Sequence, residues 1–447
     1  MSISKKSLLV GVATATVALV ATFVAPAANA STASSCAAIG SGYAAQNGKT
    51  VEVFTSVVGD ELTRYAAASA DFTACTGIKI NWNGSDQFEG QLPVRVAGGT
   101  APDLALIPQP GLLAQMVSTG KVVPAPKSVV RNVHRYWSSS WVKLGSVNGT
   151  FYAAPNSANL KSLVWYSPKQ FAKYNYTVPT TWTDMFKQSD KMAAAGQTAW
   201  CGGIGSGGAT GWPATDWLEE VVVREAGATV YNNWISHKVK FSDAPIIHAM
   251  NTVWGWLGNS KYVGTVKTIA STSFQDAVTG IPSGKCMQLQ QASFIAASLP
   301  KGSVVSPTGD AWVYYLPGIS PKVKTPVEGG GEFYAAFNSN PATVEAQTYF
   351  SSAQWAISRV KAAGSNGGWL SANSGVPLST YTNPLDALSA KYLSDPSSTF
   401  VFDASDAMPA AVGAGAEWTG FTDWFANGTA VKTVAAKIDA AWPSASN

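Results

Sequence analysis

The chain of 447 residues is longer than one ordinary hydrophobic core supports, so its length predicts two lobes. Its formal net charge of +4 is small for this length, which argues against a nucleic-acid partner. Charged residues make up only 13% of the chain, whereas aromatic residues make up 11% and include 17 tryptophans. This composition suits an exported protein that recognises a neutral, hydroxyl-rich, ring-shaped solute.

The first 30 residues have the three-part layout of a cleaved secretory signal peptide. Two lysines precede an apolar run over residues 8–24, and residues 28–30 (ANA) supply a small-residue cleavage site. We therefore expect a mature chain that begins at Ser31 and is secreted or held at the extracellular face of the membrane. Lipid attachment at Cys36 is a disfavoured alternative, because no bulky aliphatic residue stands three places before this cysteine.

Four cysteines in an exported chain predict two disulfides, for which three pairings exist. We favour Cys36 with Cys75, which ties the N-terminal arm to the end of the first helix. The remaining two cysteines, Cys201 and Cys286, then form the second disulfide, which joins segments that are far apart in sequence. No two cysteines form a CxxC motif and the three histidines are dispersed, so the sequence predicts neither a metal site nor a cofactor.

Strands and helices alternate in the first part of the mature chain. Strands are expected at residues 50–56, 78–82 and 103–107, and helices at 60–74, 88–97 and 112–118. Residues 103–107 (DLALI) form a short apolar run between turn residues, which is typical of a strand buried on both faces. This alternation favours a mainly parallel, doubly wound sheet.

A short polar segment at residues 156–159 is the expected first crossing to a second lobe. Capped amphipathic helices are expected beyond it, at 178–192 and 212–227. A strand at 333–339 and a helix over 342–362 indicate a return to the first lobe. The expected boundaries are a signal peptide at 1–30, lobe 1 at 31–157 and 328–372, and lobe 2 at 158–327 and 373–447.

Several segments, in order, resemble the extracellular solute-binding proteins of sugar ABC transporters, and in particular their α-glucoside-binding members. These segments are residues 76–113, 149–171, 178–182, 209–220, 286–295, 329–337 and 402–418. The resemblance implies a hinged, two-lobed α/β fold of the type II periplasmic-binding-protein class, with a doubly wound, mainly parallel sheet in each lobe. It implies no catalysis, and a monomer that delivers its solute to the membrane permease subunits of an ABC importer.

A sugar presents apolar C–H faces and a rim of hydroxyl groups, so its site needs an aromatic platform surrounded by carboxylates and amides. Side chains of these types stand where predicted strands end or helices begin, and glycines there would let the backbone approach a ligand closely. The candidate binding residues are Asp60, Glu61, Asp86, Gln87, Gln109, Lys161, Trp212, Asp216, Gln290, Gln291, Gly330 and Gly331. Asp403, Asp406 and Trp418 resemble the family's ligand-facing loop and aromatic platform.

Some of these candidates have a structural alternative. Asp60 and Glu61 stand at a helix start, where an N-terminal cap is an equally simple role. Gly330 and Gly331 also suit a hinge, and Lys161 could form an ion pair at that hinge instead of binding a ligand.

Together these features predict high-affinity extracellular binding of a carbohydrate, namely an α-glucoside such as maltose, trehalose or a related oligosaccharide. The alternative is a secreted glycoside hydrolase acting on glucosides, which would need two carboxyl groups facing one glycosidic bond.

Overall fold

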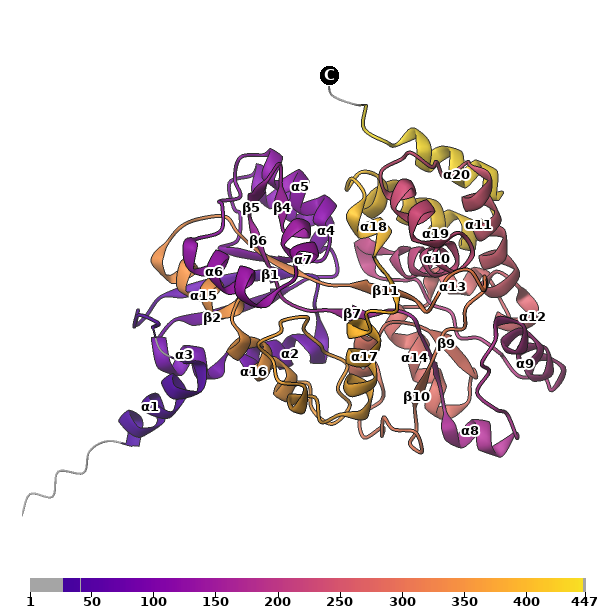
Figure 1. Ribbon diagram of the computed structural model, residues 1–447, viewed down its shortest axis with the longest axis horizontal. Coiled ribbons are helices and arrows are strands. Elements are labelled where there is room, and N and C mark those ends of the chain that lie inside the picture. Colours follow the sequence, from indigo (N-terminus) through magenta and orange to yellow (C-terminus); the bar gives the residue numbers. More distant parts are fainter. Residues whose placement is uncertain (1–26, 41, 445–447) are drawn as a thin grey trace, which may run out of the picture.

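A computed structural model describes residues 27–40 and 42–444 and shows two lobes joined by a three-stranded sheet (Figure 1). Most of the predicted signal peptide, residues 1–26, lies outside the described residues. The described chain starts in helix α1 (Ala27–Ile39). None of the helices in residues 27–40 and 42–444 has both the length and the apolar character needed to cross a membrane.

Lobe 1 is built on a five-stranded sheet with the order β2-β1-β3-β12-β6. β1 runs parallel to β2 and β3, whereas β12 is antiparallel to β3 and β6. β12 thus returns to lobe 1 from far along the chain. The strands are β1 (Thr50–Thr55), β2 (Lys79–Gly84), β3 (Leu104–Ile107), β6 (Ala153–Pro155) and β12 (Phe333–Ala336).

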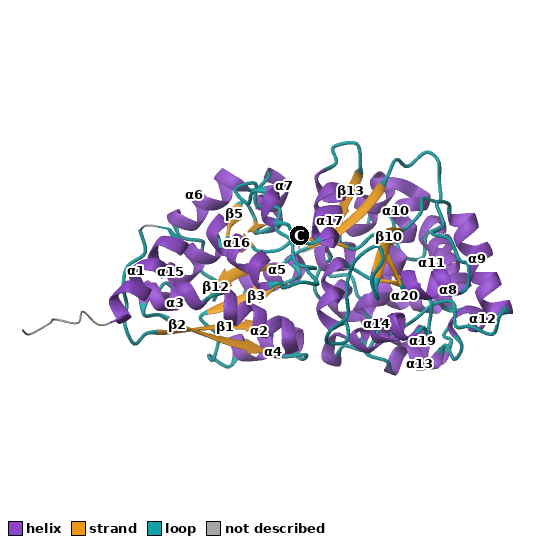
Figure 2. Ribbon diagram, turned by 90° about the horizontal axis from the view of Figure 1, so that it is seen from below, coloured by secondary structure: helices purple, strands orange, loops and turns teal. Residues whose placement is uncertain are grey.

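Strand β3 is buried on both faces, as its apolar run predicts. All four of its residues are 0% exposed, and alternate side chains enter two different cores. Leu104 and Leu106 pack beneath α2 (Gly59–Ala68), α3 (Ala70–Thr76), α15 (Pro341–Phe350) and α16 (Ala353–Ala362). Ala105 and Ile107 pack beneath α4 (Phe88–Ala97), α5 (Pro110–Ser118), α6 (Lys127–Tyr136) and α7 (Ser139–Leu144). Figure 2 shows these helices around the strands of lobe 1. A small ribbon of β4 (Ser146–Val147) and β5 (Thr150–Phe151) follows α7.

Two helices expected as single elements are each broken by a serine. The helix expected over 60–74 divides at Ser69, whose hydroxyl donates to the Ala66 carbonyl. The helix expected over 342–362 ends at Phe350, and a second helix starts after Ser352, whose hydroxyl accepts from the Trp355 N–H and caps it.

Lobe 2 has a three-stranded sheet with the order β10-β8-β9. Both of its strand pairings are antiparallel, so the prediction of a mainly parallel sheet is wrong for this lobe. The reason is that β8 is followed by a long helical excursion, after which the chain enters β9 from the opposite direction. The strands are β8 (Leu163–Tyr166), β9 (Gln288–Gln290) and β10 (Trp312–Tyr315).

Helices make up most of lobe 2. Those before β9 are α8 (Pro168–Lys173), α9 (Trp182–Ala194), η1 (Gly207–Ala209), α10 (Trp212–Ile235), α11 (Ala244–Leu257), α12 (Ser260–Val263), α13 (Lys267–Ser271) and α14 (Phe274–Ser283). Those after β9 are η2 (Ser293–Ser298), α18 (Ala404–Ala407), η4 (Val412–Glu417), α19 (Trp418–Asn427) and α20 (Val431–Ala440).

The joining sheet, with the order β13-β11-β7, carries the chain between the lobes three times. β7 precedes β8 of lobe 2, β11 precedes β12 of lobe 1, and β13 precedes α18 of lobe 2. Its strands are β7 (Asn159–Leu160), β11 (Pro326–Gly330) and β13 (Thr399–Phe402). After η3 (Leu378–Thr380), helix α17 (Pro384–Ser394) packs against β7, β11 and η2.

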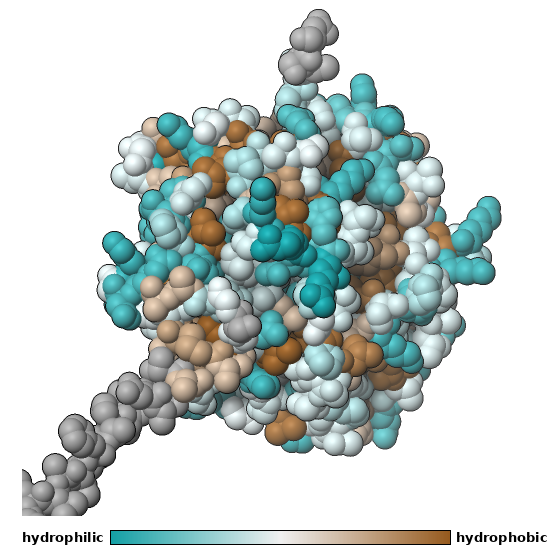
Figure 3. All heavy atoms as spheres, turned by 60° about the vertical axis from the view of Figure 1, so that its left-hand side comes forward, coloured by the Kyte–Doolittle hydropathy of each residue, from teal (hydrophilic) through white to brown (hydrophobic). Residues whose placement is uncertain are grey.

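Figure 3 brings lobe 1 to the front. Hydrophilic and intermediate residues cover most of this face, and hydrophobic residues are scattered between them in small groups. Such a mixed surface is ordinary for a folded protein whose large apolar side chains lie in its cores.

Both predicted disulfides, Cys36–Cys75 and Cys201–Cys286, are present. The first ties α1 to α3. Since the Cys36 sulfur is bonded to Cys75, it is not free for the thioether of a lipid anchor, and this disfavoured alternative is wrong. The second holds the Cys201 segment beside β9, where the Cys201 N–H donates to the Gln288 carbonyl at 2.7 Å.

Replacing Cys201 and Cys286 together by serine is expected to lower the free energy of unfolding by about 2–5 kcal/mol, because a loop spanning 85 residues is no longer closed in the unfolded chain. Urea denaturation followed by tryptophan fluorescence measures this loss. The matched double variant Cys36→Ser/Cys75→Ser opens a loop of 39 residues and should lose less. An unchanged urea midpoint for the Cys201/Cys286 variant would contradict the prediction.

Candidate functional site

A cavity of about 840 Å³ lies between the two lobes. It is lined by loops that follow β1, β2 and β3 of lobe 1, by the start of α10 and the α14 and η2 segments of lobe 2, and by the joining sheet. Its volume falls in the upper part of the range of ~300–1,000 Å³ for small-molecule sites. The carboxyl ends of the parallel strands β1, β2 and β3 meet at this cavity, as predicted for a ligand site in an α/β sheet.

Most of the predicted binding residues line the cavity. They are Asp60, Glu61, Asp86, Gln109, Lys161, Trp212, Gly330, Gly331, Asp403, Asp406 and Trp418. Asp60 and Glu61 lie in the first turn of α2 but do not cap it, because Val58 occupies the N-cap position without a side-chain bond.

Four predicted residues do not line the cavity. Asp216 lies behind Lys161, and Gln290 holds Lys161 in place by donating from Nε2 to its carbonyl at 2.9 Å. Gln291 accepts from the Ala292 N–H through Oε1 at 2.7 Å. Gln87 is exposed at the cleft rim, with its Oε1 close to Gly208 of lobe 2.

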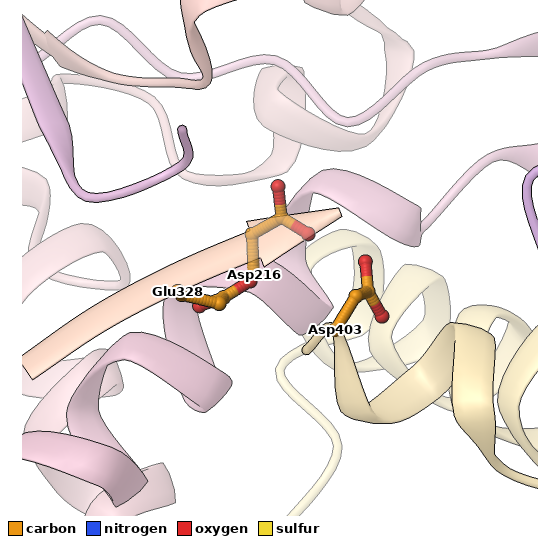
Figure 4. Close-up of side chains that lie close together, drawn as sticks. All are labelled: Asp216, Glu328 and Asp403. Atoms are coloured by element: carbon orange, nitrogen blue, oxygen red, sulfur yellow. The ribbon is translucent and has the colours of Figure 1, made fainter. Parts of the chain in front are cut away.

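Lys161 is the central charge of the site. Its side chain is 5% exposed, and its ammonium lies 2.7 Å from Asp216 Oδ1 and 3.8 Å from Glu328 Oε1 and pairs also with Asp403. Figure 4 shows these three carboxylates converging from α10, from β11 and from the residue before α18. Lys161 therefore forms the ion pairs that were its structural alternative, and it also lines the cavity, where its contact with a ligand stays a prediction.

The three carboxylates around Lys161 have the spacing of a metal site, since one oxygen from each lies within 4.8 Å of the others. The chain supplies its own cation at this point, the Lys161 ammonium. The donor set therefore does not call for a metal ion.

The charge states in this cluster follow from burial and from Lys161. Burial opposes the charge of Lys161, but Asp216, Asp403 and Glu328 together raise its pKa well above the usual value. Burial likewise opposes ionisation of Asp403, yet Lys161 and hydrogen bonds from Ser405 and Asp406 lower the pKa of Asp403. Burial raises the pKa of Asp216 to about 7 against the attraction of Lys161. Asp403 thus carries the negative charge that balances Lys161.

Trp212 forms an aromatic wall on lobe 2. It begins α10, and its ring lies edge-on to Phe274 with centroids 5.0 Å apart and 6.0 Å from the Phe294 ring. Lys161 Nζ lies 5.7 Å from the Trp212 ring centroid. Gly211, just before it, has φ 115°, and a Cβ there would lie 2.1 Å from the Trp418 carbonyl oxygen, so this close approach requires glycine.

Trp369 lines the cavity on the lobe 1 side, but its ring is only 2% exposed and belongs to a core of that lobe. Its Nε1 donates to Tyr65 Oη at 3.1 Å, and Tyr65 Oη donates to Glu332 Oε2 at 2.8 Å. The Arg359 guanidinium lies 5.2 Å from the Trp369 ring and pairs with Glu61 at 3.3 Å. Burial raises the pKa of Glu61 to about 7, with Arg359 acting in the opposite direction.

Gln109 and Glu89 form a polar pair at the lobe 1 side of the cavity. Gln109 Nε2 donates to Glu89 Oε1 at 3.2 Å, and burial raises the pKa of Glu89. Gln109 is 5% exposed, and its Oε1 has no hydrogen-bond partner among the described residues. An amide oxygen left unpaired beside a cavity is suited to accept a hydrogen bond from a hydroxyl group.

The cavity wall is acidic although the chain as a whole is basic. Lys161 is the one cation among the described residues that line it. The lining carboxyl groups belong to Asp60, Glu61, Asp86, Glu89, Asp276, Glu332, Asp403 and Asp406. Such a wall offers many hydrogen-bond acceptors to hydroxyl groups and repels anionic solutes.

Several lining residues were not predicted from the sequence, namely Glu89, Phe274, Phe294, Glu332 and Trp369. Two had a usable signal. Glu89 opens the helix after a predicted cleft loop, and Trp369 follows two consecutive glycines. Phe274 and Phe294 had none, because their position depends on how α14 and η2 pack against α10.

Lys161→Met is expected to destabilise the protein by about 3–5 kcal/mol, because it leaves buried carboxylates without their cation. Those carboxyl groups must then stay protonated when folded but ionise when unfolded, so stability falls as the pH rises through the gap between the two pKa values. The loss should therefore be larger at about pH 8 than at about pH 5 when measured by urea denaturation.

The matched control is Lys169→Met, which removes a pair with Asp310 from a lysine whose side chain is 62% exposed. This change should cost less than about 1 kcal/mol at either pH. Equal losses for the two variants would contradict the role assigned to Lys161.

Two named binding proteins are similar in sequence to nearly the whole chain. It is 35% identical over 402 residues to the osmoprotective compounds-binding protein GgtB of Synechocystis, covering 88% of this chain and 93% of that protein. It is 34% identical over 416 residues to the alpha-glucosides-binding periplasmic protein AglE of Rhizobium meliloti, covering 89% and 88% respectively.

Solved structures of low identity share the fold. The bacterial solute receptor AcbH superposes with a TM-score of 0.75 at 16% identity, covering 88% of this chain and 98% of that one. Maltose-bound T. maritima MalE3 gives a TM-score of 0.65 at 16% identity, with the same coverage. The predicted two-lobed, type II binding-protein fold is thereby confirmed.

The model of one protein family matches residues 55–359, which is more than half of the chain. Its members are extracellular and bind solutes, so the predictions of an exported binding protein and of binding without catalysis are confirmed. The chain belongs to the bacterial extracellular solute-binding proteins, and the cavity between its lobes is the candidate solute site.

Proposed function

We propose that this protein binds an α-glucoside, such as maltose, trehalose or a related oligosaccharide, between its lobes and delivers it to the permease subunits of an ABC importer. The N-terminal signal peptide exports it, and it acts as a monomer outside the cytoplasmic membrane. Closure of the lobes buries the sugar, and the permease binds the outer surface of the closed form.

The observation that carries this proposal is the partly exposed Trp212 ring in the cavity wall, with polar groups around it. Trp212 on lobe 2 and Trp369 on lobe 1 both line the cavity, and acidic and amide groups stand around them. Aromatic rings bury the C–H faces of sugar rings, and the carboxylates and amides pair with hydroxyl groups. The volume of about 840 Å³ suits a solute of more than one sugar ring.

The α-glucoside class is supported by the relative from Rhizobium meliloti, which is an alpha-glucosides-binding protein. The Synechocystis relative binds osmoprotective compounds. The glycoside-hydrolase alternative finds no support among these relatives, which are binding proteins. The acidic cavity wall further argues for a solute without negative charge.

Purified mature protein should be stabilised by at least one α-glucoside in a thermal-shift screen of maltose, maltotriose, trehalose, sucrose and palatinose, with cellobiose and glucose as comparisons. A ligand at 100 times its Kd adds roughly 2.7 kcal/mol to the folded state. Chromatography should recover the sugar unchanged. No shift with any α-glucoside would contradict the proposed solute class, and breakdown of the sugar would contradict binding without catalysis.

Trp212→Ala is expected to weaken binding of the stabilising sugar by about 30-fold or more, because roughly 2–3 kcal/mol of aromatic contact is removed. Isothermal titration calorimetry measures the change. Trp442→Ala is the matched control, since Trp442 stacks on His237 at 4.0 Å and does not line the cavity. The prediction is wrong if both variants bind like the wild type.

A further inference from the structure

The two lobes touch at a glycine. Gly111 is the second residue of α5 in lobe 1, and its backbone faces the Met408 carbonyl of lobe 2. A Cβ added to Gly111 would lie 1.8 Å from the Met408 oxygen and 3.3 Å from the Ala410 nitrogen. Cβ atoms do not approach a backbone oxygen this closely, so any other residue at position 111 would push the lobes apart.

Both sides of this contact are fixed within their own lobes. Leu112 and Leu113, which follow Gly111, are buried in a core of lobe 1. Met408 is 0% exposed in the main core of lobe 2, and its N–H donates to the Ala404 carbonyl at 2.9 Å. Neither backbone can yield locally without disturbing a core, because protein interiors are closely packed.

The contact is directly linked to the cavity on each side. Gln109 lines the cavity two residues before Gly111, and Asp406 lines it two residues before Met408. A solute that bridges the Gln109 and Asp406 segments therefore also draws Gly111 toward Met408.

We infer that Gly111 is a positioning residue for binding: because it has no side chain, the lobes can close fully around the solute. The inference rests on the proposed function and adds the residue whose lack of a side chain permits full closure. With a larger residue at position 111, the closed state is less populated, and the apparent affinity falls by the same factor.

A second contact between the lobes, at Gly208, can accommodate a side chain more easily than the contact at Gly111. The Gly208 N–H of lobe 2 donates to the Asp86 carbonyl of lobe 1 at 3.0 Å. A Cβ on Gly208 would meet the Oε1 of Gln87 at 2.7 Å, but that atom ends a flexible and exposed side chain that can turn away. Gly208→Ala should therefore affect closure much less than Gly111→Ala.

The test uses Gly111→Ala in the mature protein, with Gly90→Ala as the matched control. Gly90 lies in the first turn of α4 in the same lobe, and a Cβ there meets no atom within 4 Å. Alanine favours helices over glycine, so both variants should keep or raise the melting temperature of the unliganded protein. Gly111→Ala should lose affinity for the stabilising sugar by about tenfold or more, and Gly90→Ala should not.

A second readout needs no solute. Cysteines introduced by Asp86→Cys and Gly208→Cys stand where the two backbones hydrogen-bond across the cleft, so the rate of their oxidation to a disulfide reports closure. Adding Gly111→Ala should slow this oxidation about tenfold, and adding Gly90→Ala should leave it unchanged.

The outcomes separate the two proposals. If no sugar binds the wild type but Gly111→Ala still slows cross-linking, the proposed solute is wrong and the role of Gly111 stands. If Gly111→Ala cross-links as fast as Gly90→Ala, or binds sugar as tightly, the inference is overturned. A lowered melting temperature of unliganded Gly111→Ala would also overturn it, because the residue would then be needed for folding of lobe 1.

Discussion

The ion-pair cluster around Lys161 connects the hinge, lobe 2 and the cavity. Lys161 lies between β7 and β8, and its partners come from α10, from β11 and from the start of α18. Buried carboxylates without a cation would be strongly destabilising, so these three elements are held at one place. The same ammonium faces the cavity beside Trp212. The Lys161 ammonium thus contacts both the joining sheet and the cavity wall. A shift of the joining strands would therefore also change the shape of the cavity.

Much of the fold could be predicted from the sequence because its signals are local. The apolar run of β3, the capped start of α9 at Thr181 and the span of α4 are properties of a few adjacent residues. The antiparallel sheet of lobe 2 could not be predicted this way, because strand direction depends on how the chain returns after the helices α8 to α14. The breaks at Ser69 and Ser352 were missed since serine is common inside and at the ends of helices.

In the candidate site, too, the residues set by local sequence signals were predicted and those set by long-range packing were not. Residues that follow a strand or open a helix, such as Asp60, Gln109 and Trp212, line the cavity as predicted. Asp216 is four residues from Trp212 on α10, and both were predicted to bind the ligand. Asp216 instead points inward and pairs with Lys161. A buried ammonium without a carboxylate partner would be strongly destabilising, whereas a carboxylate facing the cavity could be hydrated. Phe274 and Phe294 enter through packing between helices, which no local pattern reports.

The joining sheet has a mechanical consequence. A single linker would let the lobes swivel freely, but three strands hydrogen-bonded side by side resist torsion and yield mainly by bending across their width. Bending of this sheet is therefore the motion that we expect to open and close the lobes. Solutes of different length would then produce one common end point of closure rather than a range of twisted forms, and a downstream receptor would need to recognise only that single outline.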